Sequence, residues 1–164
     1  LLIYNIVMSQ FFIENSDIIL RLIVAAGLGL FIGLERAVVH KEAGMKTHAL
    51  VSIGAAVFVI ISEMIAMKYG LFGSFDPSRV ASQIIVGIGF LGAGSIILQG
   101  NRLLGLTTAG GLWVTAGIGM AAGFGFYSLA FITAVLIFLV LTAVNIIEKP
   151  IRKLAGEKVE DEKV

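Results

Sequence analysis

Polar side chains gather in two short connections of the sequence, and these residues are the best suited to chemistry. Each connection contains an arginine and a glycine and closes on threonine. The candidates are Glu35, Arg36, Lys46, Thr47 and His48 in the first connection and Asn101, Arg102, Thr107 and Thr108 in the second. A helix N-terminus carries free N–H groups and a partial positive charge. Two such starts brought together, with hydroxyls and a lysine, would therefore bind an anion.

Two other interpretations of the same residues stay open. Thr47, Thr107 and Thr108 are suitable N-caps for the helices that follow them. Glu35 adds a negative charge, which favours a cation or an ion pair with Lys46 or Arg102 that locks the connections together. The residues alone do not choose between a binding site and a structural one.

A second candidate face begins at Asp76, which has the composition of a helix start. Asp76 would cap the helix, and a proline would occupy its first position. Arg79, Gln83 and Gly87 follow at intervals of one turn and share a face that leads inward. Arg79 could pair with Asp76 or with Glu63, and a charge so close to apolar sequence is a functional candidate.

Several kinds of chemistry have no support in the sequence. The chain has no cysteine, which excludes a disulfide framework and a thiol nucleophile. His40 and His48 have only Glu42 beside them, so no metal-ligand spacing is visible and no metal site is assigned. No basic surface indicates nucleic-acid binding. We therefore expect no enzyme, no cofactor and no nucleic-acid partner.

The elements that position these residues are five long apolar stretches. Hydrophobic residues make up 58% of the chain and charged residues 14%, against about a quarter charged in soluble proteins. The stretches cover residues 18–34, 48–66, 80–98, 107–123 and 126–147. Each is long enough to cross a hydrocarbon layer about 30 Å thick. The sequence predicts an all-α membrane protein with five transmembrane helices in a single domain, 18–147, which packs in the lipid bilayer.

The charges between the stretches predict the orientation. With the N-terminus outside, nine Lys and Arg residues face the cytoplasm and three face outward. That asymmetry follows the positive-inside rule. Residues 1–17 are then an external segment and residues 148–164 a charged cytoplasmic tail. Met8 reads as a more natural start than Leu1, so residues 1–7 are not firmly part of the native protein, and no cleaved signal peptide is expected.

The chain contains 20 glycines, which in lipid indicate close helix packing. The expected contact residues are Gly29, Gly33, Gly89, Gly92 and Gly94, with Trp113 in the core. The cluster 87–94 is also compatible with a broken helix. The stretch 126–147 has no glycine and should face lipid or a partner subunit, so we expect a homo-oligomer.

An internal repeat relates the first two pairs of stretches. Residues 27–33 align with 87–93 at an offset of 60, and residues 44–47 align with 105–108 at an offset of 61. The first four stretches would then form two helical hairpins of parallel orientation, related by an axis along the membrane normal. Similar glycine-rich composition without duplication is the alternative.

Six ordered motifs resemble the MgtC/SapB family of prokaryotic membrane proteins. They are Gly33-Leu34-Glu35-Arg36, Ala43-Gly44-Met45-Lys46-Thr47-His48, Asp76-Pro77-Ser78-Arg79, Gly87-Ile88-Gly89-Phe90-Leu91-Gly92-Ala93-Gly94, Gly105-Leu106-Thr107-Thr108-Ala109 and Trp113. The resemblance covers roughly residues 17 to 147. Met45-Lys46 stands where the family more often shows Leu-Arg. The chain looks like a short form without the ACT-like cytoplasmic domain of many relatives.

The resemblance implies magnesium homeostasis in a prokaryotic plasma (inner) membrane and, in pathogens, a link to virulence. We therefore interpret the chain as a transporter-like multi-pass membrane protein, with Mg²⁺ as its substrate or as a signal. The alternative is a regulator that moves no ion and binds another membrane complex, such as the rotary ATP synthase or a P-type magnesium pump. Mg²⁺ prefers oxygen ligands in an octahedral set. Only Glu35, Glu63 and Asp76 lie near the predicted membrane, which favours the regulator.

Overall fold

The computed structural model describes residues 10, 12–69, 76 and 78–154. Nearly all of them are helical. The helices are α2 (Ser16–Val38), α3 (Met45–Tyr69), α4 (Ser78–Gly94), α5 (Leu106–Gly123) and α6 (Tyr127–Leu154). Two short strands, β1 (Ile97–Gln99) and β2 (Arg102–Leu104), lie between α4 and α5. The predicted all-α class holds, with one small hairpin added.

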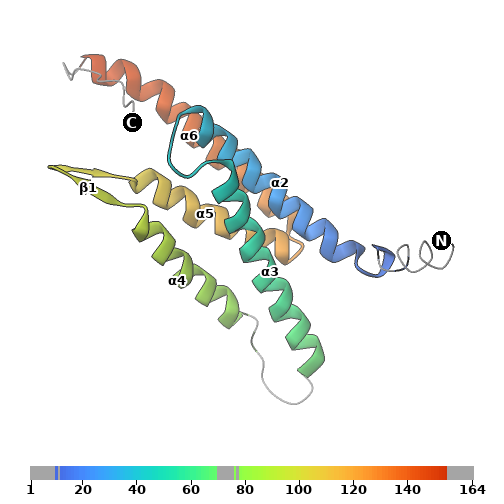
Figure 1. Cartoon of the computed structure of the whole chain (residues 1–164). Helices are drawn as coiled ribbons and strands as arrows, with labels where there is room; N and C mark the ends of the chain where they lie inside the picture. The colour runs from blue at the N-terminus through green and yellow to red at the C-terminus, as the bar shows by residue number, and fades with distance from the viewer. Residues whose placement is uncertain (1–9, 11, 70–75, 77, 155–164) are drawn as a thin grey trace, which may run out of the picture.

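The helices pack as an elongated bundle around α3 and α5 (Figure 1). Helices α2, α3 and α5 contact one another, α4 packs on α5 and α3, and α6 packs on α2 and α5. The α2–α3 connection, the β-hairpin and the C-terminal end of α6 lie toward the same end of the bundle (Figure 1). We call this the loop end. It is where the two polar connections of the sequence come together.

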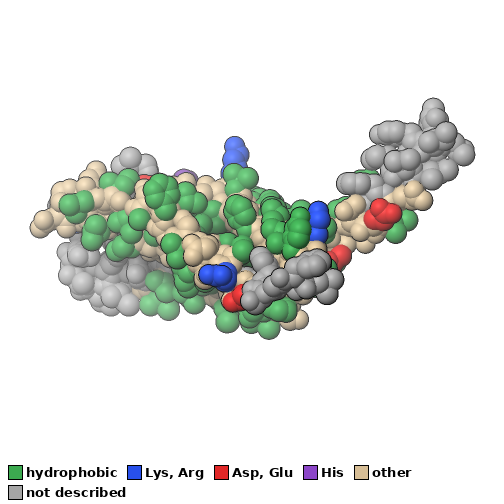
Figure 2. Space-filling model, turned by 90° about the horizontal axis from the view of Figure 1, so that it is seen from below, with side chains coloured by type: hydrophobic (Ala, Val, Ile, Leu, Met, Phe, Trp, Pro, Cys, Tyr) green, Lys and Arg blue, Asp and Glu red, His purple; other side chains and the backbone are tan. Residues whose placement is uncertain are grey.

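The outer surface of the bundle suits a hydrocarbon environment. Within the part of the chain that the structure describes, three helical segments are long and apolar enough to cross a membrane: Ser16–Val38, Met45–Tyr69 and Tyr127–Val144. Helix α4 is apolar but shorter. One face of the molecule is made largely of hydrophobic side chains with scattered charges (Figure 2). The count of five spans, the orientation and the repeat stay predictions.

The predicted stretch 80–98 is wrong at its C-terminal end. Helix α4 stops at Gly94, where the Ser95 hydroxyl and N–H both donate to the carbonyl of Gly92. Strands β1 and β2 then pair antiparallel, and Gly100, at a φ of 61°, occupies the turn. An apolar run reads alike as helix or strand, so hydropathy placed these residues in the span. At the other end of the chain, α6 continues beyond residue 147 to Leu154.

Helix α3 packs closely between two pairs of glycines, one on α2 and one on α5. A Cβ built on Gly29 would lie 2.7 Å from the carbonyl oxygen of His48, and one on Gly33 would lie 2.5 Å from the Cα of Met45. Across α3, a Cβ on Gly119 would lie 2.1 Å from the carbonyl oxygen of Ser52. Gly123 is in similar contact with Ala56 at 2.9 Å. The prediction for Gly29 and Gly33 is confirmed, because only glycine permits this approach of two backbones.

Of the other four packing predictions, those for Gly89, Gly94 and Trp113 are corrected by the structure. Nothing lies within 4 Å of a Cβ on Gly89 or Gly94, because α4 stands at the edge of the bundle. Gly92 is a buried contact residue as predicted, but a Cβ there would lie 3.6 Å from the Cβ of Ala109, an ordinary contact that does not require glycine. Trp113 is 52% exposed rather than in the core. The inner face of α5 is in backbone contact with α3 and leaves no volume for an indole ring, so the ring lies on the apolar outer surface.

Candidate functional site

The most deeply buried charges of the described residues lie at the loop end, where α2 finishes. Arg36 is 1% exposed and Glu35 is 6% exposed. The Nε of Arg36 donates to Oε2 of Glu35 at 2.5 Å. A buried charge needs a partner because the desolvation of an isolated ion costs several kcal/mol. The sequence pointed to Lys46 or Arg102 as partners, but both of these side chains are exposed.

His48 is fully buried between α3 and α5 beside this ion pair. Its Nδ1 lies 3.1 Å from the carbonyl oxygen of Gly44, so this nitrogen carries the proton and donates. Its Nε2 has no hydrogen-bond partner among the described residues and faces Gly111. The charges of Glu35 and Arg36 both act electrostatically on the ring. The imidazole therefore holds an unused acceptor inside a polar cluster.

The threonines do not cap the two helices, which corrects the prediction for Thr47, Thr107 and Thr108. Both helices begin earlier, directly after the aligned glycines Gly44 and Gly105. The carbonyl of Gly44 accepts from His48 N, and that of Gly105 accepts from Ala109 N. No side chain caps α5. Gly105 has a φ of 86°, and a Cβ there would lie 1.9 Å from the carbonyl oxygen of Ser95, so this turn requires glycine.

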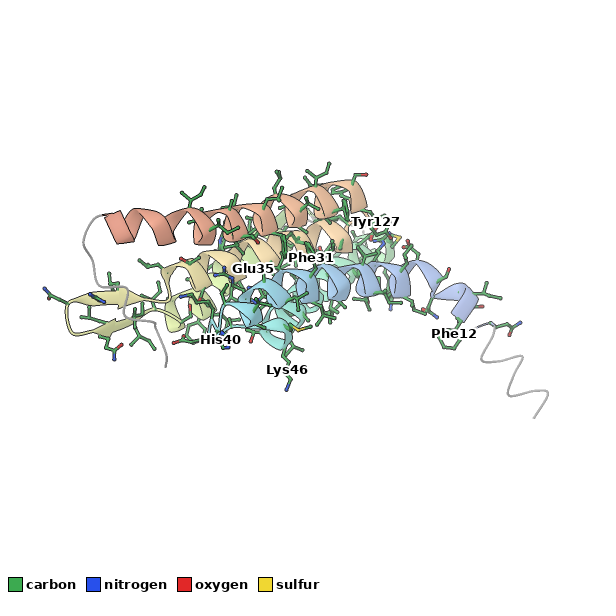
Figure 3. The ribbon with its side chains drawn as sticks, turned by 90° about the horizontal axis from the view of Figure 1, so that it is seen from above. Phe12, Phe31, Glu35, His40, Lys46 and Tyr127 are labelled. Carbon is green, nitrogen blue, oxygen red and sulfur yellow. The ribbon has the colours of Figure 1, made fainter. Side chains whose placement is uncertain are left out.

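The structure does bring the two helix starts to one cavity. Thr47 and Thr108 both line a cavity of about 370 Å³, together with Glu42 and Ser95. Of the other predicted residues, Lys46 and Thr107 are exposed at the helix starts, and Asn101 and Arg102 are exposed at the hairpin. Figure 3 shows Lys46 pointing away from the bundle, whereas Glu35 lies among the helices. The anion site expected from Lys46 and His48 is therefore not assembled as a single volume.

The side chain of Glu35 faces a different cavity, on the side of the bundle toward α6. It lines a second cavity of about 430 Å³ between α2 and α6. Thr142 lines the same cavity, and its hydroxyl is buried without a hydrogen-bond partner among the described residues. The remaining walls are apolar side chains: Leu34, Val38, Val39, Phe138 and Ile146. Of the nine residues predicted as one site, Thr47 and Thr108 line one cavity, Glu35 lines another and pairs with Arg36, and His48 is buried beside that pair. The remaining four are exposed.

The second candidate face is present on α4. Oδ1 of Asp76 accepts from Ser78 N at 2.9 Å, as the predicted cap requires, and these hydrogen bonds from Ser78 hold the pKa of the exposed Asp76 carboxyl below its usual value. The cap is therefore present above ordinary carboxyl pKa values and is lost as the pH falls through the lowered one. Gln83 and Gly87 line a groove of about 520 Å³ between α3 and α4.

Arg21 forms an ion-pair network at the end of the bundle opposite the loop end. Its guanidinium bonds Asp17 at 2.8 Å, as the i,i+4 spacing predicts. It also bonds the carboxylate of Glu63 and donates to the carbonyl of Gly123 at 2.9 Å. Glu63, which the sequence suggested as a partner for Arg79, therefore pairs with Arg21 instead. No pattern in the sequence pointed to this link between α2, α3 and α5.

The buried polar cluster inside long apolar helices defines a multi-pass membrane protein. The MgtC family model matches residues 22–150, and the chain belongs to the MgtC family. The relatives include the putative magnesium transporter YhiD of Escherichia coli K12, 43% identical over 77% of this chain and 60% of that protein. Protein MgtC of Brucella abortus is 43% identical over 76% of this chain and 48% of that protein. Protein SapB of Bacillus subtilis is 36% identical over 92% and 65%.

No solved structure matches the chain. The chain spans less than two thirds of the length of these relatives. Among the described residues there is no group of three or more histidine, aspartate or glutamate side chains that could hold a metal ion.

Proposed function

We propose that this chain serves magnesium homeostasis in a prokaryotic plasma membrane, with the Glu35–Arg36 pair at its functional centre. Membership of the MgtC family and the name of the relative YhiD support the magnesium link. The buried pair carries the assignment to a centre, because apolar side chains of the same volume would stabilise the fold at least as well. Charged groups inside membrane helices generally mark function.

The packing of the bundle favours a regulator that moves no Mg²⁺ through the interior of one chain. Mg²⁺ travels with tightly held water and needs a wide polar path. Between α3 and α5 the backbones are in contact at Gly119 and Gly123, and α2 closes on α3 at Gly29 and Gly33. In this proposal the chain acts by binding another membrane complex, such as the rotary ATP synthase or a P-type magnesium pump, and catalyses no reaction.

Transport of Mg²⁺ is the second candidate, and the position of Glu35 favours it. Its carboxylate lines a cavity on the flank of the bundle, between α2 and α6. A second copy of the chain placed there could complete a path that one chain lacks. The proposed homo-oligomer is therefore essential to transport and dispensable for regulation.

Flux through vesicles distinguishes the two functions. Purified protein in proteoliposomes should pass no more Mg²⁺ than empty vesicles, while Glu35→Gln should still abolish growth complementation at low Mg²⁺. Glu14→Gln, the same change at an exposed carboxylate, is the matched control and should complement. Complementation is normalised to the amount of folded protein in the membrane. Mg²⁺ flux that Glu35→Gln removes would instead establish transport, and full complementation by Glu35→Gln would reject the centre.

A further inference from the structure

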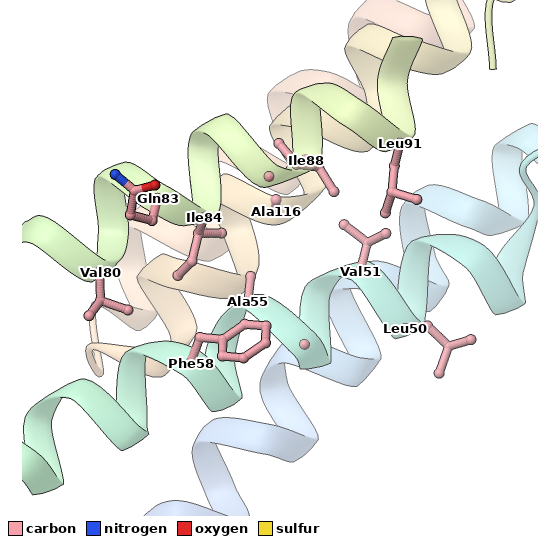
Figure 4. A pocket seen from close by; sticks show the side chains of 12 residues that line it. Leu50, Val51, Ala55, Phe58, Val80, Gln83, Ile84, Ile88, Leu91 and Ala116 are labelled. Carbon is pink, nitrogen blue, oxygen red and sulfur yellow. The ribbon is translucent and has the colours of Figure 1, made fainter. Parts of the chain in front are cut away.

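A groove between α3 and α4 is lined almost entirely by apolar side chains. Its volume is about 520 Å³. Figure 4 shows side chains of both helices facing the groove, with α5 behind it. The aliphatic and aromatic walls come from Leu50, Val51, Ala55, Phe58, Val80, Ile84, Ile88, Leu91 and Ala116. In a membrane such a groove is filled by hydrocarbon or by another helix.

The length of the groove matches one leaflet of a bilayer. On α4 the lining runs from Val80 to Leu91. Eleven steps of about 1.5 Å give a length of roughly 16 Å. The hydrocarbon layer is about 30 Å thick, so the groove covers about half of it. An acyl chain is confined to one leaflet, and a groove of this length accommodates it.

Two glycines leave space inside the groove, and no other side chain fills that space. Gly54 on α3 and Gly87 on α4 both line it, and nothing lies within 4 Å of a Cβ built on either residue. A narrow chain can therefore lie against both backbones and gain dispersion contacts along them.

Polar groups occur only toward the N-terminal end of α4. Gln83 is the one polar side chain of the lining, and its amide is exposed. Arg79 lies one turn earlier on the same face and is also exposed. The nearby Asp76 carboxylate is engaged by Ser78 N–H, and Arg79 acts on it only through space. An anionic group with an ester carbonyl beside it would meet a cation and an amide donor in that order.

We propose that the α3–α4 groove is a phospholipid site. One acyl chain lies between α3 and α4, Arg79 binds the phosphate, and the Gln83 amide donates to an ester carbonyl. In the predicted orientation this lipid belongs to the outer leaflet. The site is distinct from the Glu35–Arg36 centre at the loop end.

Photolabelling tests the site with a matched pair of glycine variants. The probe is phosphatidylglycerol with a diazirine in its acyl chain, in vesicles of phosphatidylethanolamine and phosphatidylglycerol that contain the full chain. Gly87→Leu fills the groove and should reduce labelling of α3 and α4 about tenfold, since two or more methylene groups lose their burial. Gly89→Leu lies on another face of α4, where a Cβ also has open space, and should label like the parent.

Arg79→Gln gives an independent readout of the headgroup. It should lower labelling by the phospholipid probe while leaving labelling by a neutral diazirine diacylglycerol unchanged. Equal labelling of Gly87→Leu and Gly89→Leu would overturn the site and leave only general contact with lipid. A dimer in native mass spectrometry that Gly87→Leu dissolves would assign the groove to a second copy of the chain and would also overturn it.

Discussion

Two aligned glycine-rich segments of the sequence lie in different environments. Residues 27–33 of α2 and residues 87–93 of α4 are the aligned copies of the predicted repeat. In the α2 segment, Gly29 and Gly33 touch the backbone of α3. In the α4 segment, a Cβ on Gly89, the counterpart of Gly29, would meet nothing within 4 Å, and one on Gly92 would meet Ala109 of α5 only at an ordinary contact distance. A glycine motif therefore permits close approach of two helices, but the partner that it meets decides whether the approach occurs.

The partner in the tight case is a stretch of small residues on α3. Ala49, Ser52 and Ala56 place short side chains against the glycines of both α2 and α5. Helix α4 packs on α5 with Gly92 near Ala109 and Ile88 in one cluster with Ala116, and its side toward α3 is the open groove. The stability of the bundle should therefore lie in α2, α3 and α5, while the α4 edge keeps room for ligands.

The largest difference between core and edge should come from their arginines. Arg36→Met leaves the Glu35 carboxylate buried without its ion pair and should lower the free energy of unfolding by about 3–5 kcal/mol. Arg79→Met removes an exposed charge from the α4 edge and should cost less than about 1 kcal/mol. Unfolding by SDS in mixed micelles, followed by circular dichroism, measures both. Equal losses would mean that the Glu35–Arg36 pair is not desolvated.

A second comparison uses two glycines on α5. Gly119→Ala forces a methyl group onto the Ser52 carbonyl and should cost about 3 kcal/mol, because neither backbone can move away alone. Gly117→Ala lies two residues earlier, where nothing is within 4 Å, and should be neutral or slightly stabilising. The same SDS titration separates them. A neutral Gly119→Ala would show that α3 and α5 are further apart than the contact implies.

The aligned glycines of the two copies give the most direct test. Gly29→Ala should cost about 2 kcal/mol, since its Cβ would lie within 3 Å of α3. Gly89→Ala should instead gain up to about 1 kcal/mol, because alanine is the better helix former and meets no neighbour. Thermal unfolding in detergent gives the sign of each change. Destabilisation by Gly89→Ala would indicate a contact of α4 with another copy of the chain.

The smallest predicted effect lies in the connections themselves. His40 has a φ of 55° after α2, a conformation that glycine adopts without strain and that Gly105 supplies before α5. His40→Gly should therefore stabilise the fold by up to about 1 kcal/mol. Differential scanning calorimetry detects a change of this size, with Lys41→Gly as the control at a residue without positive φ. A loss of stability would show that the His40 side chain contributes a contact of its own.

The positions of the helices could be predicted well from the sequence, because a helix in lipid needs a long run of apolar residues and hydropathy measures such runs. The sequence predicted the contact at Gly29 and Gly33 from spacing alone. It did not single out Gly119 and Gly123, which have the same spacing, because composition does not say which helix faces α3. The predicted cap role of the threonines is wrong because the two helices already start at Met45 and Leu106, two residues before Thr47 and Thr108. Arg21 and Glu63 are 42 residues apart in the sequence, so their pairing could not be predicted from a local pattern.

The β-hairpin indicates where the surface of the membrane lies along the bundle. Its sheet has only two strands, so each strand leaves one edge of N–H and carbonyl groups without a partner in the sheet. Such edges cannot enter hydrocarbon, where each unpaired group would cost several kcal/mol. The lipid boundary must therefore fall close to Gly94 and Leu106, where the helices give way to the hairpin. Ile97, Leu98 and Leu103 are exposed and give the hairpin an apolar surface suited to that boundary. We therefore expect the hairpin to fix the depth at which α4 and α5 sit in the bilayer.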